Sequence, residues 1–245
     1  MRGLTSTEVL AAWELGASQS PARRALTLLA YGCGGETLEF LARLPIGQRD
    51  ARLLELRERT LGPHLSSLAR CPACGEQVQA EFETADIRAP EGGVTAPGEL
   101  HHGGLSARLR LPDSGDLDAA ARAPNPSAAR RELIARCVVE LHASDHGASQ
   151  TVDDLPEEFI AMIADRISAA DPQADAQLAL NCPACGHRWN ALFDIAEFFW
   201  AELQSCARRL LSEVHELAAA YGWREADILG LTPARRAAYL GWVRG

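Results

Sequence analysis

Lysine is absent from this chain of 245 residues, and all 24 of its basic residues are arginine. Without a lysine amine, the chain cannot form a Schiff base, hold a nucleotide phosphate with a P-loop lysine, or use lysine as a general base. The chain also has no apolar run of the roughly 18–20 residues that a membrane-spanning helix needs. These absences exclude lysine-dependent enzymes and predict no membrane span.

A signal-peptide core and an excess of positive charge are missing as well. Glu8 and Glu14 interrupt the first 15 residues, so we expect a cytoplasmic protein. The formal net charge is −9, which would repel nucleic-acid phosphates over most of the surface. An apolar content of 47% and a charged content of 23% are typical of a soluble globular protein.

The seven cysteines cannot all pair, and four of them belong to a repeated motif. The sequence Cys-Pro-Ala-Cys-Gly occurs at residues 71–75 and again at residues 182–186. Each copy has the spacing and trailing glycine of a zinc knuckle, and two knuckles supply the four thiolates of a closed tetrahedral Zn²⁺ site. The predicted ligands of one structural Zn²⁺ are Cys71, Cys74, Cys182 and Cys185. If they share one ion, segments more than a hundred residues apart must meet.

Two other chemistries use similar motifs. Thiol–disulfide enzymes place Cys-Pro-x-Cys at a helix start after a strand, whereas here a strand is predicted to follow each copy. A catalytic zinc needs an open position, which four cysteines do not leave, and the chain has no His-x-Glu of the zinc deaminases. His101–His102 is a weaker metal candidate, and a solvated loop pair is the preferred interpretation. We therefore predict no catalytic residues.

Hydrophobic periodicity predicts a mixture of helices and short strands. Residues 4 to about 70 are predicted to be helical, with helices also at about 115–123 and 127–140 and another after Pro156. Alternating apolar and polar residues predict the following strands: 78–83, 105–111, 176–181 and 187–192. Residues 89–104 and 142–153 are predicted loops.

The strongest helical signal lies near the C-terminus. From Asp194 to Tyr221, apolar residues recur at steps of four and three, which is a heptad seam. The seam consists of Ala196, Trp200, Leu203, Ala207, Leu210, Val214, Leu217 and Tyr221. Gly222 should end this helix, and a final helix should begin at Thr232–Pro233.

These elements predict an α+β protein that is mostly helical. An N-terminal helical bundle precedes a zinc ribbon formed from the two distant knuckles, with a helical insertion between them and a long C-terminal helix. The predicted parts are residues 1–68 (helical region), 69–88 and 175–193 (zinc ribbon), 89–174 (insertion of strand and helices) and 194–245 (C-terminal helical arm).

Several segments together resemble a known family. They are Leu44-Pro45-Ile46-Gly47-Gln48-Arg49-Asp50, the two knuckles, Asp171-Pro172-x-Ala174-Asp175, Phe199-Trp200-Ala201-Glu202, and an ending that contains Tyr221-Gly222-Trp223 and Arg235-Arg236-x-x-Tyr239-Leu240. In these segments the chain resembles bacterial proteins of the T-even-type phage baseplate family, which occur in contractile, phage-tail-like injection systems and are related to baseplate hub assembly chaperones.

The resemblance implies a role without enzymatic activity, as a baseplate component or a hub assembly factor. The implied partners are hub, spike or wedge proteins of the baseplate, with no small-molecule substrate. The implied location is the bacterial cytoplasm, with incorporation into the assembled particle left open. The alternative is a zinc-ribbon protein that binds nucleic acid or is linked to transcription, which the acidic charge disfavours.

Overall fold

The computed structural model describes residues 1–89, 94–143 and 151–245. Among these residues the α-helices are α1 (Ser6–Gly16), α2 (Pro21–Gly32), α3 (Leu38–Ala42), α4 (Ile46–Leu61), α5 (Ser114–Ala120), α6 (Pro126–Cys137), α7 (Glu157–Ala170), α8 (Ile195–Tyr221), α9 (Glu225–Leu229) and α10 (Pro233–Arg244). Short 3₁₀ turns are η1 (Thr84–Ile87), η2 (Val152–Asp154) and η3 (Pro172–Asp175). The prediction of a mostly helical α+β protein is confirmed.

The strands form three small antiparallel sheets. They are β1 (His64–Arg70) with β2 (Gln77–Glu83), β3 (Glu99–His102) with β4 (Leu105–Leu109) and β5 (Val138–Ala143), and β6 (Gln177–Asn181) with β7 (Arg188–Leu192). The predicted strands on both sides of the second knuckle and after the first knuckle are therefore present.

Three strands correct the predictions from the sequence. Residues 64–70, expected to be helical, form β1, because Gly62 at φ 95° and Pro63 end α4 and the chain then pairs with β2. Residues 138–140, expected to end a helix, and residues 142–143, expected in a loop, belong to β5, since pairing with β4 outweighs helical propensity. Residues 99–102, expected in a loop, form β3. The predicted loops at 89–104 and 142–153 lie partly at 90–93 and 144–150, outside the described residues.

The main hydrophobic core joins the N-terminal helices to the first half of α8. Leu28, Leu53 and Leu56 are fully buried there, and Leu203 and Ala207 of the predicted seam pack into the same cluster. The heptad pattern is therefore satisfied inside one chain, because α1, α2 and α4 all contact α8. The N-terminal bundle and the start of the C-terminal helix share a single core.

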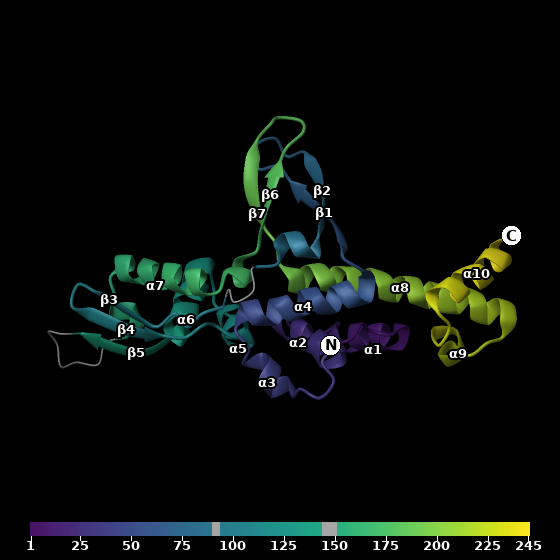
Figure 1. Ribbon diagram of the computed structural model, residues 1–245, viewed down its shortest axis with the longest axis horizontal. Coiled ribbons are helices and arrows are strands. Elements are labelled where there is room, and N and C mark those ends of the chain that lie inside the picture. Colours follow the sequence, from purple (N-terminus) through teal and green to yellow (C-terminus); the bar gives the residue numbers. More distant parts are fainter. Residues whose placement is uncertain (90–93, 144–150) are drawn as a thin grey trace.

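The chain forms three projections around this core (Figure 1). The hairpins β1–β2 and β6–β7 rise together above α4 and α8. The sheet β3–β4–β5 with α6 and α7 lies at one end of the long axis, where Phe159 and Ile163 bury its apolar face. The distal part of α8 with α9 and α10 forms the other end, around a small cluster of Leu217, Ile228 and Leu240. No helix of the described residues combines the length and the apolarity that crossing a membrane requires.

Candidate metal centre

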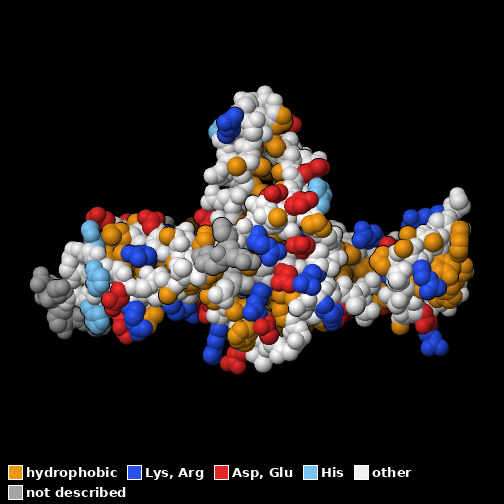
Figure 2. Space-filling view, viewed as in Figure 1, with side chains coloured by type: hydrophobic (Ala, Val, Ile, Leu, Met, Phe, Trp, Pro, Cys, Tyr) orange, Lys and Arg blue, Asp and Glu red, His pale blue; other side chains and the backbone are white. Residues whose placement is uncertain are grey.

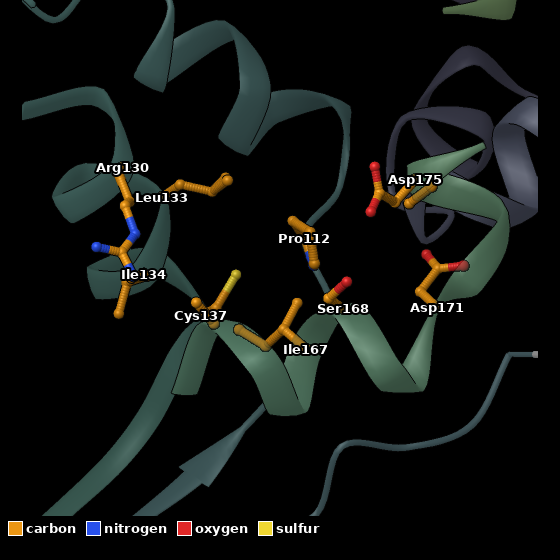
Figure 3. A pocket seen from close by; sticks show the side chains of 11 residues that line it. Pro112, Arg130, Leu133, Ile134, Cys137, Ile167, Ser168, Asp171 and Asp175 are labelled. Atoms are coloured by element: carbon orange, nitrogen blue, oxygen red, sulfur yellow. The ribbon is translucent and has the colours of Figure 1, made fainter. Parts of the chain in front are cut away.

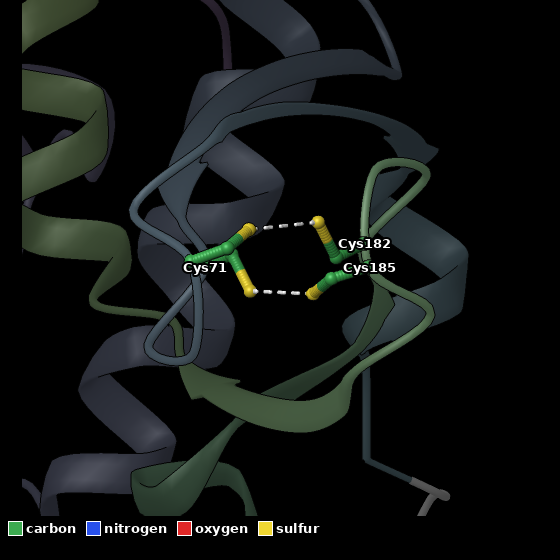
Figure 4. Close-up of side chains that lie close together, drawn as sticks. Cys71, Cys182 and Cys185 are labelled. Atoms are coloured by element: carbon green, nitrogen blue, oxygen red, sulfur yellow. Dashed lines mark hydrogen bonds between the residues drawn. The ribbon is translucent and has the colours of Figure 1, made fainter.

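Both cysteine pairs lie at the tips of hairpins. In the first hairpin the last strand pair is Arg70 with Gln77, and in the second it is Asn181 with Arg188. The Cys-Pro-Ala-Cys-Gly segments are the turns that connect these strands. The two antiparallel hairpins face each other with their tips together (Figure 4).

The two turns have the same hydrogen bonds. The N–H of Gly75 donates to the carbonyl oxygen of Cys71 at 2.9 Å, and the N–H of Gly186 donates to the carbonyl oxygen of Cys182, also at 2.9 Å. Both glycines adopt the left-handed conformation, with φ of 77° and 73°. A side chain at either position would find open space, so backbone conformation and not crowding explains why glycine follows each knuckle.

The four sulfur atoms form a compact cluster. The Sγ atoms of Cys71 and Cys185 are 3.7 Å apart, those of Cys74 and Cys182 are 3.6 Å apart, and all four lie within 4.8 Å of one another. A Zn–S bond of about 2.3 Å in a regular tetrahedron requires sulfur atoms about 3.8 Å apart. A disulfide would bring them to about 2.05 Å. The cysteines are therefore close enough to bind one metal ion, and their two contacts across the hairpins are near the tetrahedral separation.

The pKa values of the thiols indicate that the cluster needs a nearby positive charge if all four cysteines are to ionise. Burial opposes ionisation of Cys71, but the backbone N–H groups of Cys74 and Ala73 lower its pKa to about 7. The Glu76 N–H favours the Cys74 thiolate, yet the neighbouring sulfurs, with Cys185 first, raise the pKa of Cys74 to about 12. One thiolate thus forms readily and further ones repel it. A bound cation would balance the charge of all four.

A small apolar cluster supports the centre from within the hairpins. Val78 of β2 and Trp189 of β7 pack against Cys71 and Cys182, which are 2% and 1% exposed. The His187 ring stacks on Trp189 with centroids 6.0 Å apart, while its backbone carbonyl accepts from the Cys182 N–H at 2.9 Å. His187 therefore shapes the turn through its backbone.

The base of the paired hairpins is held by a residue that the sequence did not indicate. Gln173 is 5% exposed and links the segment that leaves β2 to the segment that enters β6. Its Oε1 accepts from the Ala89 N–H at 2.7 Å, and its Nε2 donates to the Ile87 carbonyl at 3.2 Å. Nothing in the local pattern marks a glutamine for this role, because its partners lie more than 80 residues away.

The other candidate ligands lie elsewhere. His101 and His102 are 3.4 Å and 3.6 Å from the carboxylates of Glu99 and Glu158. The remaining cysteines, at positions 33, 137 and 206, are buried or partly buried free thiols. Within the described ranges, the four knuckle cysteines are the one group of three or more potential ligands that converges.

Fold and site together define a mostly helical α+β protein in which a four-cysteine centre joins two distant hairpins. The chain belongs to the family of T4 bacteriophage base plate proteins, whose model matches residues 9–200. The match runs from within α1 to the first part of α8 and includes both knuckles, so the resemblance to phage baseplate proteins is confirmed, while the ending at residues 221–240 lies outside the match. Comparisons with curated proteins and with solved structures found no match. Membership of this family implies assembly with other proteins.

Proposed function

We propose that the chain is a non-enzymatic component or hub assembly factor of the baseplate in a contractile, phage-tail-like injection system. The observation that carries the proposal is the family match over residues 9–200. The proposed partners are hub, spike or wedge proteins, and the proposed location is the bacterial cytoplasm during assembly. A net charge of −9 is consistent with a protein partner in place of nucleic acid.

We further propose that Cys71, Cys74, Cys182 and Cys185 hold one structural Zn²⁺ and that the paired hairpins form a zinc ribbon. The sulfur spacing of 3.6–3.7 Å supports this assignment. The cation would supply the positive charge that four thiolates need, and the four cysteines would fill a tetrahedral shell. A filled shell leaves no position for a substrate, in keeping with a structural role.

The proposed ion would act as a clamp on the segment between the knuckles. Bringing the ends of so long a segment together costs chain entropy, which metal ligation offsets. Gln173 closes the same segment at the base of the hairpins. We propose that this clamp separates four functional parts, with the boundaries 1–68, 69–88 with 175–193, 89–174, and 194–245.

A reconstituted binding assay tests the role. The tagged chain is mixed with each purified hub, spike and wedge protein from the same gene cluster, and retained proteins are quantified. Retention of one of these proteins at micromolar concentration is expected, and a chain with residues 221–245 deleted should lose it if the C-terminal arm is the contact. Failure of every baseplate protein to bind, combined with salt-sensitive retention on heparin, would replace the proposal with the nucleic-acid alternative.

A further inference from the structure

The far end of the C-terminal arm carries a fixed group of aromatic rings, which we call the aromatic tip. It consists of Tyr221, Trp223, Tyr239 and Trp242. Tyr239 is packed edge-to-face against both tryptophans, with centroids 4.8 Å from Trp223 and 5.3 Å from Trp242. Trp242 is nevertheless 72% exposed. Figure 2 shows hydrophobic side chains gathered at this end of the molecule.

An exposed tryptophan held in place by its neighbours has the properties of an interface anchor. Trp, Tyr and Arg are the residue types that contribute most to binding at protein interfaces. Because packing against Tyr239 already restricts the indole, little conformational entropy is lost when it binds. The tip lies at the end of the long axis, beyond the core that α8 shares with the N-terminal helices, so folding of the chain does not bury Trp242.

The outer part of the C-terminal arm, residues 208–245, has a charge opposite to that of the remaining chain. Residues 208–245 contain six arginines and four acidic residues, a net charge of +2, whereas residues 1–207 contain 18 arginines and 29 acidic residues, a net charge of −11. Arg208, Arg224 and Arg235 make no ion pair with any residue that the structure describes. Two tips would repel each other, while a tip and the body of a second copy would attract.

Residues 1–207, which we call the body, contain an apolar cavity that could hold one aromatic ring. It lies between α6 and α7, has a volume of about 230 Å³, and has apolar walls that include Leu133, Ile134 and Ile167 (Figure 3). Asp175 lines the same cavity and is exposed. An apolar cavity of roughly 150 Å³ is large enough to bind benzene, so this volume admits one aromatic ring. Arg130 lines the cavity too, so it presents an apolar interior with one guanidinium and one exposed carboxylate beside it.

We infer that Trp242 of one copy inserts into the cavity between α6 and α7 of a second copy, so that the chain self-associates. The indole covers the apolar walls, and the arginines of the arm face the acidic body. The contact joins two different surfaces, which allows several copies to assemble in succession. This inference does not depend on the proposed baseplate role, since the purified chain alone forms the contact.

Two substitutions at exposed positions each remove one side of the contact. Trp242→Ala removes the anchor, and Ser168→Trp, on the exposed surface of α7 beside the cavity, blocks the entrance. Leu68→Ala is the matched control, because Leu68 is also an exposed apolar residue, at 67%, but lies on β1. Circular dichroism establishes that each variant is folded before its mass is measured.

Analytical ultracentrifugation over roughly 1–200 µM measures association, a range that covers micromolar affinity. The wild-type chain and Leu68→Ala should exceed the monomer mass of 26.4 kDa as concentration rises. Each interface variant should remain monomeric alone, with affinity for self-association at least about tenfold weaker.

An equal mixture of the two interface variants should form a complex of twice the monomer mass, because Trp242→Ala retains the cavity and Ser168→Trp retains the aromatic tip. A monomeric wild type, undiminished association of either variant, or a mixture that stays monomeric would overturn the inference.

Discussion

The backbone N–H of Gly47 donates a hydrogen bond of 2.8 Å to Oδ2 of Asp171, which lies 124 residues later in the chain. Gly47 is in the first turn of α4, whose N-cap residue, Pro45, provides no side-chain cap. Asp171, which is 2% exposed, therefore caps α4 from the segment that leads into β6. The contact attaches the insertion to the helical body. Burial raises the pKa of Asp171 despite the bond from Gly47.

Substitution of Gly47 by alanine should destabilise the protein. A Cβ at this position would lie 1.8 Å from Oδ1 of Asp171, so the carboxylate would have to move away from the helix end. We expect a loss of about 1–3 kcal/mol in the free energy of unfolding, measured by urea denaturation. Gly34→Ala is the control, because a Cβ there meets nothing within 4 Å, and its effect should stay within about 0.5 kcal/mol. Equal effects of the two substitutions would contradict this account of the contact.

Substitution of the buried Arg57 should also destabilise the protein. Its side chain, 3% exposed, donates to both carboxylate oxygens of Glu202 at 2.9 Å and 2.6 Å and to the carbonyl of Gly62 at 2.6 Å. Arg57→Met would leave Glu202 without its cation at the α4–α8 contact. We expect a loss of about 3 kcal/mol. Thermal and urea unfolding should show little change for Arg59→Met, since Arg59 and Glu55 form an exposed pair. The prediction fails if Arg57→Met is as mild as this control.

The proposed metal centre predicts a defined stoichiometry. Purified protein should contain about one Zn²⁺ per chain by plasma mass spectrometry, because four thiolates fill one tetrahedral site. Cys71→Ser and Cys185→Ser should each lower the zinc content and the melting temperature, and a chelator should do the same to the wild type. Cys206→Ser is the matched control, since Cys206 lies outside the cluster. A folded wild-type protein that contains no metal would refute the assignment.

Asp50 should make stability depend on pH. Burial raises its pKa from 3.8 to about 6, although Arg49 donates to its Oδ1 at 2.8 Å. Above pH 6 the folded protein therefore holds the buried Asp50 carboxylate in its charged form, which lowers the free energy of unfolding. As the pH falls from about 6 towards 4, the folded state takes up a proton that the unfolded state does not, so this group adds stability. The shift of about two pKa units corresponds to roughly 3 kcal/mol.

A comparison of Asp50→Asn with the wild type isolates this effect. The difference in unfolding free energy between the two proteins should change by a few kcal/mol between pH 7 and pH 4.5, with the wild type gaining as the pH falls. If the difference in unfolding free energy between Asp50→Asn and the wild type does not vary with pH, the Asp50 charge does not destabilise the folded protein.

Local signals in the sequence predicted most of the helices correctly. Ser20 and Thr232 cap α2 and α10, each before a proline, and Gly222 ends α8 in the left-handed conformation. These signals act within one turn of the chain, so they can be read without knowledge of the fold. The helical assignment of residues 64–70 and 138–140 was wrong, because β1 and β5 depend on partner strands that local patterns do not reveal.

The sequence by itself determined the mostly helical composition, the turns of the two knuckles and the identity of the four cysteines, since each depends on residues close together in the chain. The tertiary structure alone decided that the cysteines converge, that Gln173 closes the base of the hairpins, and that Asp171 caps α4. These contacts join residues more than 80 positions apart. They depend on how segments distant in the sequence pack together, which local patterns do not reveal.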